Sequence, residues 1–90
     1  MSNIKSRYFE QGMLKVLPKK IVSKRAVLEE VAQRFEPGRE YTEQEVNAVL
    51  GAIYDDITTL RRSLVDYGYM FRADDGSIYQ VDPTAIANEA

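Results

Sequence analysis

Cationic side chains gather at two places in the chain where their chemistry suits an anionic ligand. Two are adjacent near residue 61, and four lie between residues 19 and 25. Arginine and lysine bind phosphate groups, and arginine also reads the edge of a guanine base. The candidate nucleic-acid-binding residues are therefore Arg61, Arg62, Lys19, Lys20, Lys24 and Arg25.

Each of these cations also has a structural interpretation that needs no ligand. Arg61 would pair with an acidic neighbour, Asp66 or Glu45, and fasten a turn. The basic residues near the N-terminus would be a solvated helix face. The tyrosines at 41, 54, 67, 69 and 79 form either a stacking surface for bases or the rim of a small core, and we favour the core.

The composition gives little support for catalysis. The chain has no histidine and no cysteine, which removes the commonest general base, the commonest metal ligand and any disulfide. The carboxylates of Asp55, Asp56 and Asp66 have no nucleophile, metal-ligand set or phosphate-binding loop beside them in the sequence. We predict a protein that is not an enzyme and that uses no metal or cofactor.

Length and charge restrict the class of protein further. Ninety residues suffice for one domain with a thin core, and no apolar run approaches the ~20 residues of a membrane span. We expect a cytoplasmic protein with no membrane partner. Residues 1–34 carry eight basic and three acidic side chains, a balance of +5, whereas residues 35–90 carry four and eleven, a balance of −7. This asymmetry suits either a nucleic-acid-facing arm or a solvated basic helix.

Helix-start signals and apolar periodicity place three helices, over residues 24–35, 43–51 and 56–67. Each begins with a favourable cap. The caps are Ser23, Thr42 with Glu45 three residues later, and Asp55 or Asp56. A β-hairpin is predicted over 69–81, because Asp75-Gly76 is a strong turn signal. Tyr41 lies in a short link that contributes one residue pair to the small sheet.

The sequence predicts a single domain over residues 1–82, with its core in 23–81 and a mobile tail over 83–90. In the extension 1–20, a short helix through Ile4 and Tyr8 followed by an extended piece is favoured over a hairpin that turns at Gln11-Gly12. The predicted buried cluster is Leu28, Val31, Phe35, Val46, Leu50, Ile57, Leu60 and Leu64, closed by Phe71 or Tyr79 and joined by Phe9, Leu14 and Leu17.

The order helix, turn, helix, hairpin resembles a winged helix-turn-helix. We therefore predict an α+β fold, a winged helix-turn-helix-like three-helix core with a C-terminal β-hairpin wing. The general helix-turn-helix pattern matches at Val46, Leu50, Gly51, Ala52, Ile57 and Leu60. Asn47 departs from it, since a small residue is usual there. In this architecture the start of the second helix faces base edges. Here that start carries Asp55 and Asp56, and the wing tip carries Asp74 and Asp75, all of the wrong sign for phosphate. Only Arg61, Arg62 and Arg72 help at this face.

A closer resemblance covers nearly the whole chain. Its motifs read Phe9-x-x-Gly12-x-Leu14-x-x-Leu17-Pro18-x-Lys20, Phe35-Glu36-Pro37-Gly38-Arg39-x-Tyr41-Thr42-Glu43-x-Glu45-Val46-Asn47, Leu60-Arg61-Arg62-x-Leu64-Val65-Asp66-Tyr67-Gly68 and Gly76-Ser77-x-Tyr79. In these the chain resembles an uncharacterised bacterial family, number 2087 among the domains of unknown function. That family is often fused behind regulators of the arsenic-repressor type, so the resemblance implies a link to transcriptional control.

Two functions follow as expectations. The first is a non-catalytic, transcription-associated regulatory domain that contacts duplex DNA weakly or indirectly. The alternative is a protein-interaction, dimerisation or sensing module without nucleic-acid binding, whose partner is another regulator or a second copy. In that case Val65, Tyr69 and Met70 supply an exposed apolar surface. A continuous basic face would favour nucleic acid, and an apolar patch a protein partner.

Overall fold

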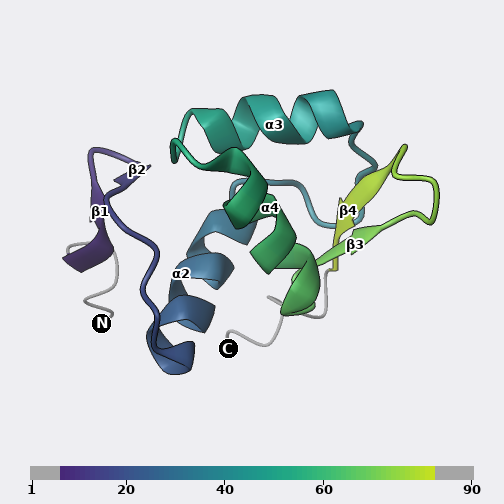
Figure 1. The fold of residues 1–90 in the computed structure, drawn as a ribbon. Coiled ribbons are helices and arrows are strands. Elements are labelled where there is room, and N and C mark those ends of the chain that lie inside the picture. Colours follow the sequence, from purple (N-terminus) through teal and green to yellow (C-terminus); the bar gives the residue numbers. More distant parts are fainter. Residues whose placement is uncertain (1–6, 83–90) are drawn as a thin grey trace.

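Three helices lie between two antiparallel strand pairs in the computed structural model, which describes residues 7–82. In chain order the elements are β1 (Phe9–Glu10), β2 (Met13–Leu14), α2 (Ile21–Ala32), α3 (Glu43–Gly51), α4 (Ile57–Asp66), β3 (Met70–Arg72) and β4 (Tyr79–Val81). Figure 1 shows the β1–β2 and β3–β4 pairs on opposite sides of the helices. The predicted α+β class is confirmed, and the arrangement is compatible with a winged helix.

The N-terminal strand pair differs from the favoured prediction. Phe9–Glu10 and Met13–Leu14 form a hairpin that turns at Gln11 and Gly12, both with positive φ, 54° and 82°. That backbone twist suits a two-residue hairpin turn. The amide of Leu14 also donates to the Ile53 carbonyl at 2.7 Å, a tertiary contact that no local pattern reveals. The expected short helix from Ile4 lies largely outside the described residues.

Helix α2 begins two residues before the predicted cap. Lys20 occupies the N-cap position without a side-chain capping bond, and Ile21 and Val22 form the first turn. Ser23 is therefore not the cap. Its side chain is instead hydrogen-bonded to that of Tyr8, which lowers the pKa of Tyr8. The predicted end at residue 35 is also wrong, because after Ala32 the backbone tightens into turns whose amides bond three residues back.

Helices α3 and α4 begin where their caps predict. Thr42 and Glu45 exchange both capping-box hydrogen bonds, at 2.9 and 3.1 Å. Asp56 caps α4 by accepting from the Thr59 amide at 3.2 Å and from its hydroxyl at 2.8 Å. Gly51 ends α3 at a close approach, since a Cβ there would lie 3.3 Å from the Ile57 side chain.

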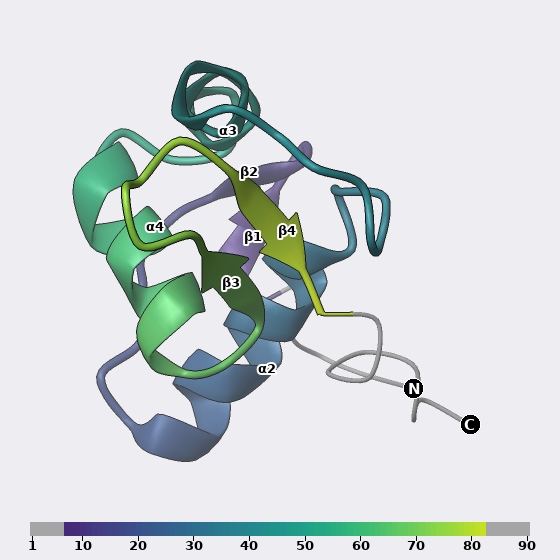
Figure 2. The same ribbon diagram turned by 90° about the vertical axis from the view of Figure 1, so that its right-hand side faces the viewer.

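Strands β3 and β4 form the wing, the hairpin over residues 70–81. Tyr41, in the link before α3, pairs with Tyr79 through two backbone hydrogen bonds of 2.8 and 2.7 Å. The Tyr41 hydroxyl accepts from the Glu36 amide at 2.9 Å, and its ring meets Phe35 edge-on at 5.1 Å. Figure 2 shows the wing facing the viewer, with α3 above it and α2 below. The wing is thus joined to the helices through Tyr41.

The core is one cluster to which all three helices, the wing and the N-terminal hairpin contribute. Its members are Phe9, Leu14, Val27, Leu28, Val31, Ala32, Phe35, Tyr41, Val46, Leu50, Ile53, Leu60, Leu64, Tyr69, Met70, Tyr79 and Val81. Tyr79 closes it, whereas Phe71 points outward with 61% of its surface exposed. Ile57 and Leu17 pack against the cluster but are only partly buried. Within residues 7–82 no helix has both the length and the apolarity to cross a membrane.

Candidate functional site

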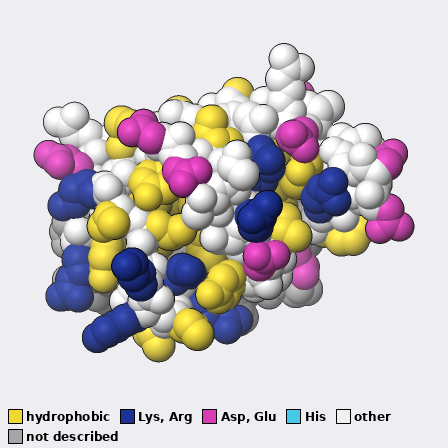
Figure 3. All heavy atoms as spheres, viewed as in Figure 1, with side chains coloured by type: hydrophobic (Ala, Val, Ile, Leu, Met, Phe, Trp, Pro, Cys, Tyr) yellow, Lys and Arg dark blue, Asp and Glu magenta, His cyan; other side chains and the backbone are white. Residues whose placement is uncertain are grey.

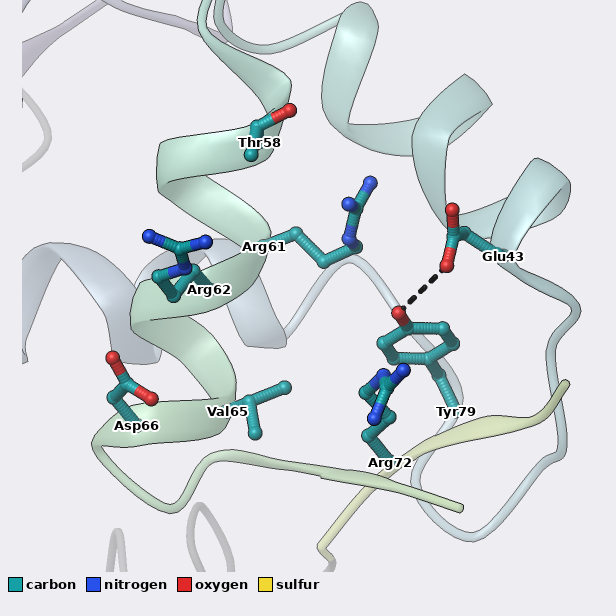
Figure 4. A pocket seen from close by; sticks show the side chains of 8 residues that line it. All are labelled: Glu43, Thr58, Arg61, Arg62, Val65, Asp66, Arg72 and Tyr79. Atoms are coloured by element: carbon teal, nitrogen blue, oxygen red, sulfur yellow. Dashed lines mark hydrogen bonds between the residues drawn. The ribbon is translucent and has the colours of Figure 1, made fainter. Parts of the chain in front are cut away.

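A groove lies between α4 and the wing, and three arginines line it. In Figure 3 dark blue side chains gather at this place with magenta carboxylates at the edge. The groove has a volume of about 340 Å³. Figure 4 shows its lining residues: Glu43, Thr58, Arg61, Arg62, Val65, Asp66, Arg72 and Tyr79. Most come from α4, with one each from the start of α3, from β3 and from β4.

The periodicity of α4 explains why it presents cations to the groove. Leu60 and Leu64 are fully buried in the core and Ile57 packs beside them. Residues on the opposite face, among them Arg61 and Arg62, then point away from the core. Arg61 is half-buried and Arg62 is exposed. The two predicted arginines therefore both line one groove, as the sequence suggests.

The partner of Arg61 is not the carboxylate that the structural interpretation expects. Its Nη1 donates to the side-chain oxygen of Asn47, on α3. Glu45 is engaged in the capping box, and no bond joins Arg61 to Asp66 in the described structure. An amide acceptor orients the guanidinium without cancelling its charge. The unusual asparagine at this position of the helix-turn-helix pattern thus has a structural role, which the sequence marks only as a departure.

Arg62 and Arg72 are available to a ligand. Neither guanidinium makes a hydrogen bond or an ion pair with another residue in the range 7–82, although that of Arg72 is near enough to Asp75 to help lower the pKa of that carboxyl. Arg72 extends over the wing turn, and its Nη2 lies 2.7 Å from where a Cβ on Gly76 would be. Glycine at 76 therefore leaves space for this guanidinium. The sequence marks Arg72 as a cation that helps at this face, but nothing local shows that β3 passes beside α4.

Carboxylates flank the groove. Glu43 accepts a hydrogen bond of 2.9 Å from the Tyr79 hydroxyl, which joins α3 to β4, and Asp66 lies at the end of α4 (Figure 4). Three guanidinium groups against two carboxylates leave a small positive balance. Such a site suits a single anionic group better than a long polyanion.

The other predicted cations lie on a different surface. Lys19, Lys20 and Arg25 are exposed near the start of α2, and Lys24 is half-buried. The Lys24 ammonium lies 5.5 Å and the Arg25 guanidinium 6.0 Å from the centroid of the Tyr67 ring, at the C-terminal end of α4. None of these four lines the groove. The structure therefore divides the six candidates into two groups.

The tyrosines follow the favoured interpretation, whereas the expected exposed apolar surface is wrong. Tyr41, Tyr69 and Tyr79 are buried, so the tyrosines form no exposed stacking surface. Tyr69 and Met70 are buried and Val65 is half-buried, so these three residues form no exposed apolar patch. Tyr69 and Met70 were placed by alternation in a short hairpin, which does not reveal how far the wing folds over the core. Across residues 7–82 no cluster of acidic residues has the arrangement of a metal site.

The family described as "Uncharacterized protein conserved in bacteria (DUF2087)" matches residues 13–81. The chain belongs to this family. The match includes both helices that form the groove, the whole wing and all six candidate cations. No curated protein and no solved structure matches the chain. Family membership therefore places the groove and the α2 cations within the shared domain, and the residues themselves must carry any argument about function.

Proposed function

We propose that this chain is a non-catalytic, transcription-associated regulatory domain of winged-helix type that contacts the phosphates of duplex DNA weakly through the groove. The observation that carries the proposal is the convergence of Arg61, Arg62 and Arg72 from α4 and β3. In the described structure the Arg62 guanidinium makes no hydrogen bond or ion pair, the Arg61 guanidinium is held by the uncharged Asn47, and that of Arg72 has only the exposed Asp75 carboxylate near it. Guanidiniums whose charge is not cancelled by a hydrogen-bonded carboxylate are suited to phosphate.

The order of the elements supports this use. The Tyr41–Tyr79 bridge, α3, α4 and the wing follow one another as in a winged helix. When such a domain binds DNA, its second helix enters the major groove and the rest of the domain contacts the backbone. With α4 as that helix, a groove between α4 and the wing would receive the sugar–phosphate backbone. Phosphate contacts position a protein without reading sequence.

The acidic residues at the usual contact points limit the affinity. Asp56 caps α4, and Asp75 accepts from the amide and hydroxyl of Ser77 at 3.0 and 2.7 Å. Both carboxylates have structural roles, but each also repels phosphate, as do Asp55 and Asp74. We therefore expect a dissociation constant on the order of 10⁻⁵ M at physiological salt, rising steeply as salt is added.

Fluorescence anisotropy with a short labelled duplex tests the proposal. The Arg62→Ala/Arg72→Ala variant should lower the slope of log K against log salt by about two. Lys15→Ala/Lys19→Ala removes two exposed charges that do not line the groove, and serves as the matched control. Equal affinity of the two variants would contradict the proposal. Nanomolar, sequence-selective binding would replace it with a direct repressor or activator.

A further inference from the structure

The start of α2 carries exposed aliphatic side chains among cations. Val22 is 82% exposed and Ile21 58% exposed, and Lys19, Lys20 and Arg25 beside them are exposed as well. We call Lys19, Lys20, Ile21, Val22, Lys24 and Arg25 the α2-start surface. Figure 3 shows hydrophobic and basic side chains interleaved over the N-terminal end of α2. Apolar side chains this exposed mark an interaction site more often when they are clustered than when they occur singly.

The aliphatic pair contributes nothing to the core of the domain. Helix α2 buries Val27, Leu28, Val31 and Ala32, whereas Ile21 and Val22 lie a full turn or more before them. Polar residues at these two positions would serve the fold equally well. Their contact with water is therefore unfavourable in free energy, and contact with an external apolar partner would remove that cost.

The surrounding charge indicates the chemistry of that partner. The first turn of α2 contains no acidic residue. Lys24 and Arg25 are held against the Tyr67 ring, which keeps their charged ends near the surface rather than free to swing away. A partner must therefore carry carboxylates to meet these cations. Phosphates of a nucleic acid would satisfy the cations but leave Ile21 and Val22 without an apolar contact.

We infer that the α2-start surface docks an acidic segment of another protein that presents aliphatic or aromatic side chains between its carboxylates. Its apolar residues would cover Ile21 and Val22, and its carboxylates would pair with the flanking cations. The six residues of the α2-start surface are far fewer than the roughly 20–30 residues a side of a stable interface, which fits a transient contact. This inference is independent of DNA contact at the groove, because the two surfaces share no residue.

Selection from a library of random short peptides against the full chain tests the inference. The enriched peptides should combine Asp or Glu with Leu, Ile or Phe, and should shift the backbone amide signals of residues 19–25 in NMR spectra. Ile21→Ser/Val22→Ser should weaken the best peptide about tenfold, since two aliphatic contacts are lost. Val16→Ser is the control, because Val16 is also an exposed valine, at 53%, but lies outside this surface.

Several outcomes would overturn the inference. They are a selection that enriches nothing, enriched peptides without acidic residues, and a best peptide that binds the Ile21→Ser/Val22→Ser variant as tightly as the parent chain. A short DNA duplex that shifts the amide signals of Ile21 and Val22 would instead assign the surface to nucleic acid. Because these substitutions lie at exposed positions, the variant should fold, and its unchanged thermal melt establishes that lost binding is not lost structure.

Discussion

The groove and the α2-start surface are both rich in cations, yet their neighbours differ. In the groove, Asn47 holds Arg61 while Glu43 and Asp66 flank the arginines, and the surroundings are mostly polar. At the start of α2 the cations stand beside Ile21 and Val22, which are exposed to water. The same residue types therefore suit a phosphate in one place and an acidic, apolar segment in the other. Counting charges cannot distinguish these sites, whereas the side chains between the charges do.

The largest effect is expected from a substitution in the core, because the core supports both the groove and the α2-start surface. Leu60 is fully buried where α4 packs into the core. Leu60→Ala should cost about 2–5 kcal/mol of unfolding free energy, a large part of the stability of a small domain. Chemical denaturation measures this cost. A variant as stable as the parent would show that α4 is not anchored as described.

Removing charge from one surface at a time tests whether the two sites are separate. The Arg61→Ala/Arg62→Ala/Arg72→Ala variant should weaken duplex binding by roughly tenfold or more at low salt, because phosphate contacts supply most of the affinity. Replacing the four α2 cations by alanine should change it much less. Anisotropy measures both affinities. The reverse ranking would make α2 the nucleic-acid face.

Single substitutions at Asn47 test whether the charge of Arg61 acts in duplex binding. Asn47→Asp keeps an oxygen acceptor for Arg61 but adds a negative charge, so duplex affinity should fall by several-fold, about as much as with Arg61→Ala. Asn47→Ala, which removes the acceptor without adding charge, should have a smaller effect. If the aspartate variant binds as well as the parent, the charge of Arg61 does not act in binding.

Acid should loosen the wing before it affects the α2-start surface. Hydrogen bonds from Ser77 lower the pKa of Asp75, so the folded turn holds the ionised carboxylate better than the unfolded chain does. This stabilisation is present above the ordinary pKa of aspartate and is lost as the pH falls through the lowered value in the folded turn. The Ser77 amide signal should therefore move with a midpoint below that ordinary value, while the signals of Ile21 and Val22 stay nearly constant. A Ser77 midpoint at or above the ordinary value would contradict this.

Local signals predicted α3 and α4 well because their caps and apolar faces depend on residues a few positions apart. Thr42 with Glu45, and Asp56 with Thr59, make the bonds that the sequence indicates or allows. The start of α2 could not be predicted in this way. Ile21 and Val22 face water, so no periodicity marks them, and Ser23 is hydrogen-bonded to Tyr8, which precedes β1.

The cations of the candidate site were likewise visible in the sequence, but not how they come together. Arg61 and Arg62 follow from the buried stripe of α4, which fixes the opposite face. Asn47 and Arg72 depend on how α3 and the wing pack against α4, and that geometry is tertiary. The division of the cations into two groups also needs the fold, because only the packing of α2 against the end of α4 brings Lys24 and Arg25 to Tyr67.

The pairing of Tyr41 with Tyr79 has a consequence for the motions of the domain. The two residues are far apart in the sequence but exchange both backbone hydrogen bonds, so they must separate together when the wing lifts from the helices. Their amide protons should therefore exchange with solvent at one common rate, set by this local opening rather than by global unfolding. A ligand that bridges α4 and the wing would slow both protons equally, so the Tyr41 amide would report occupancy of a groove that Tyr41 does not line.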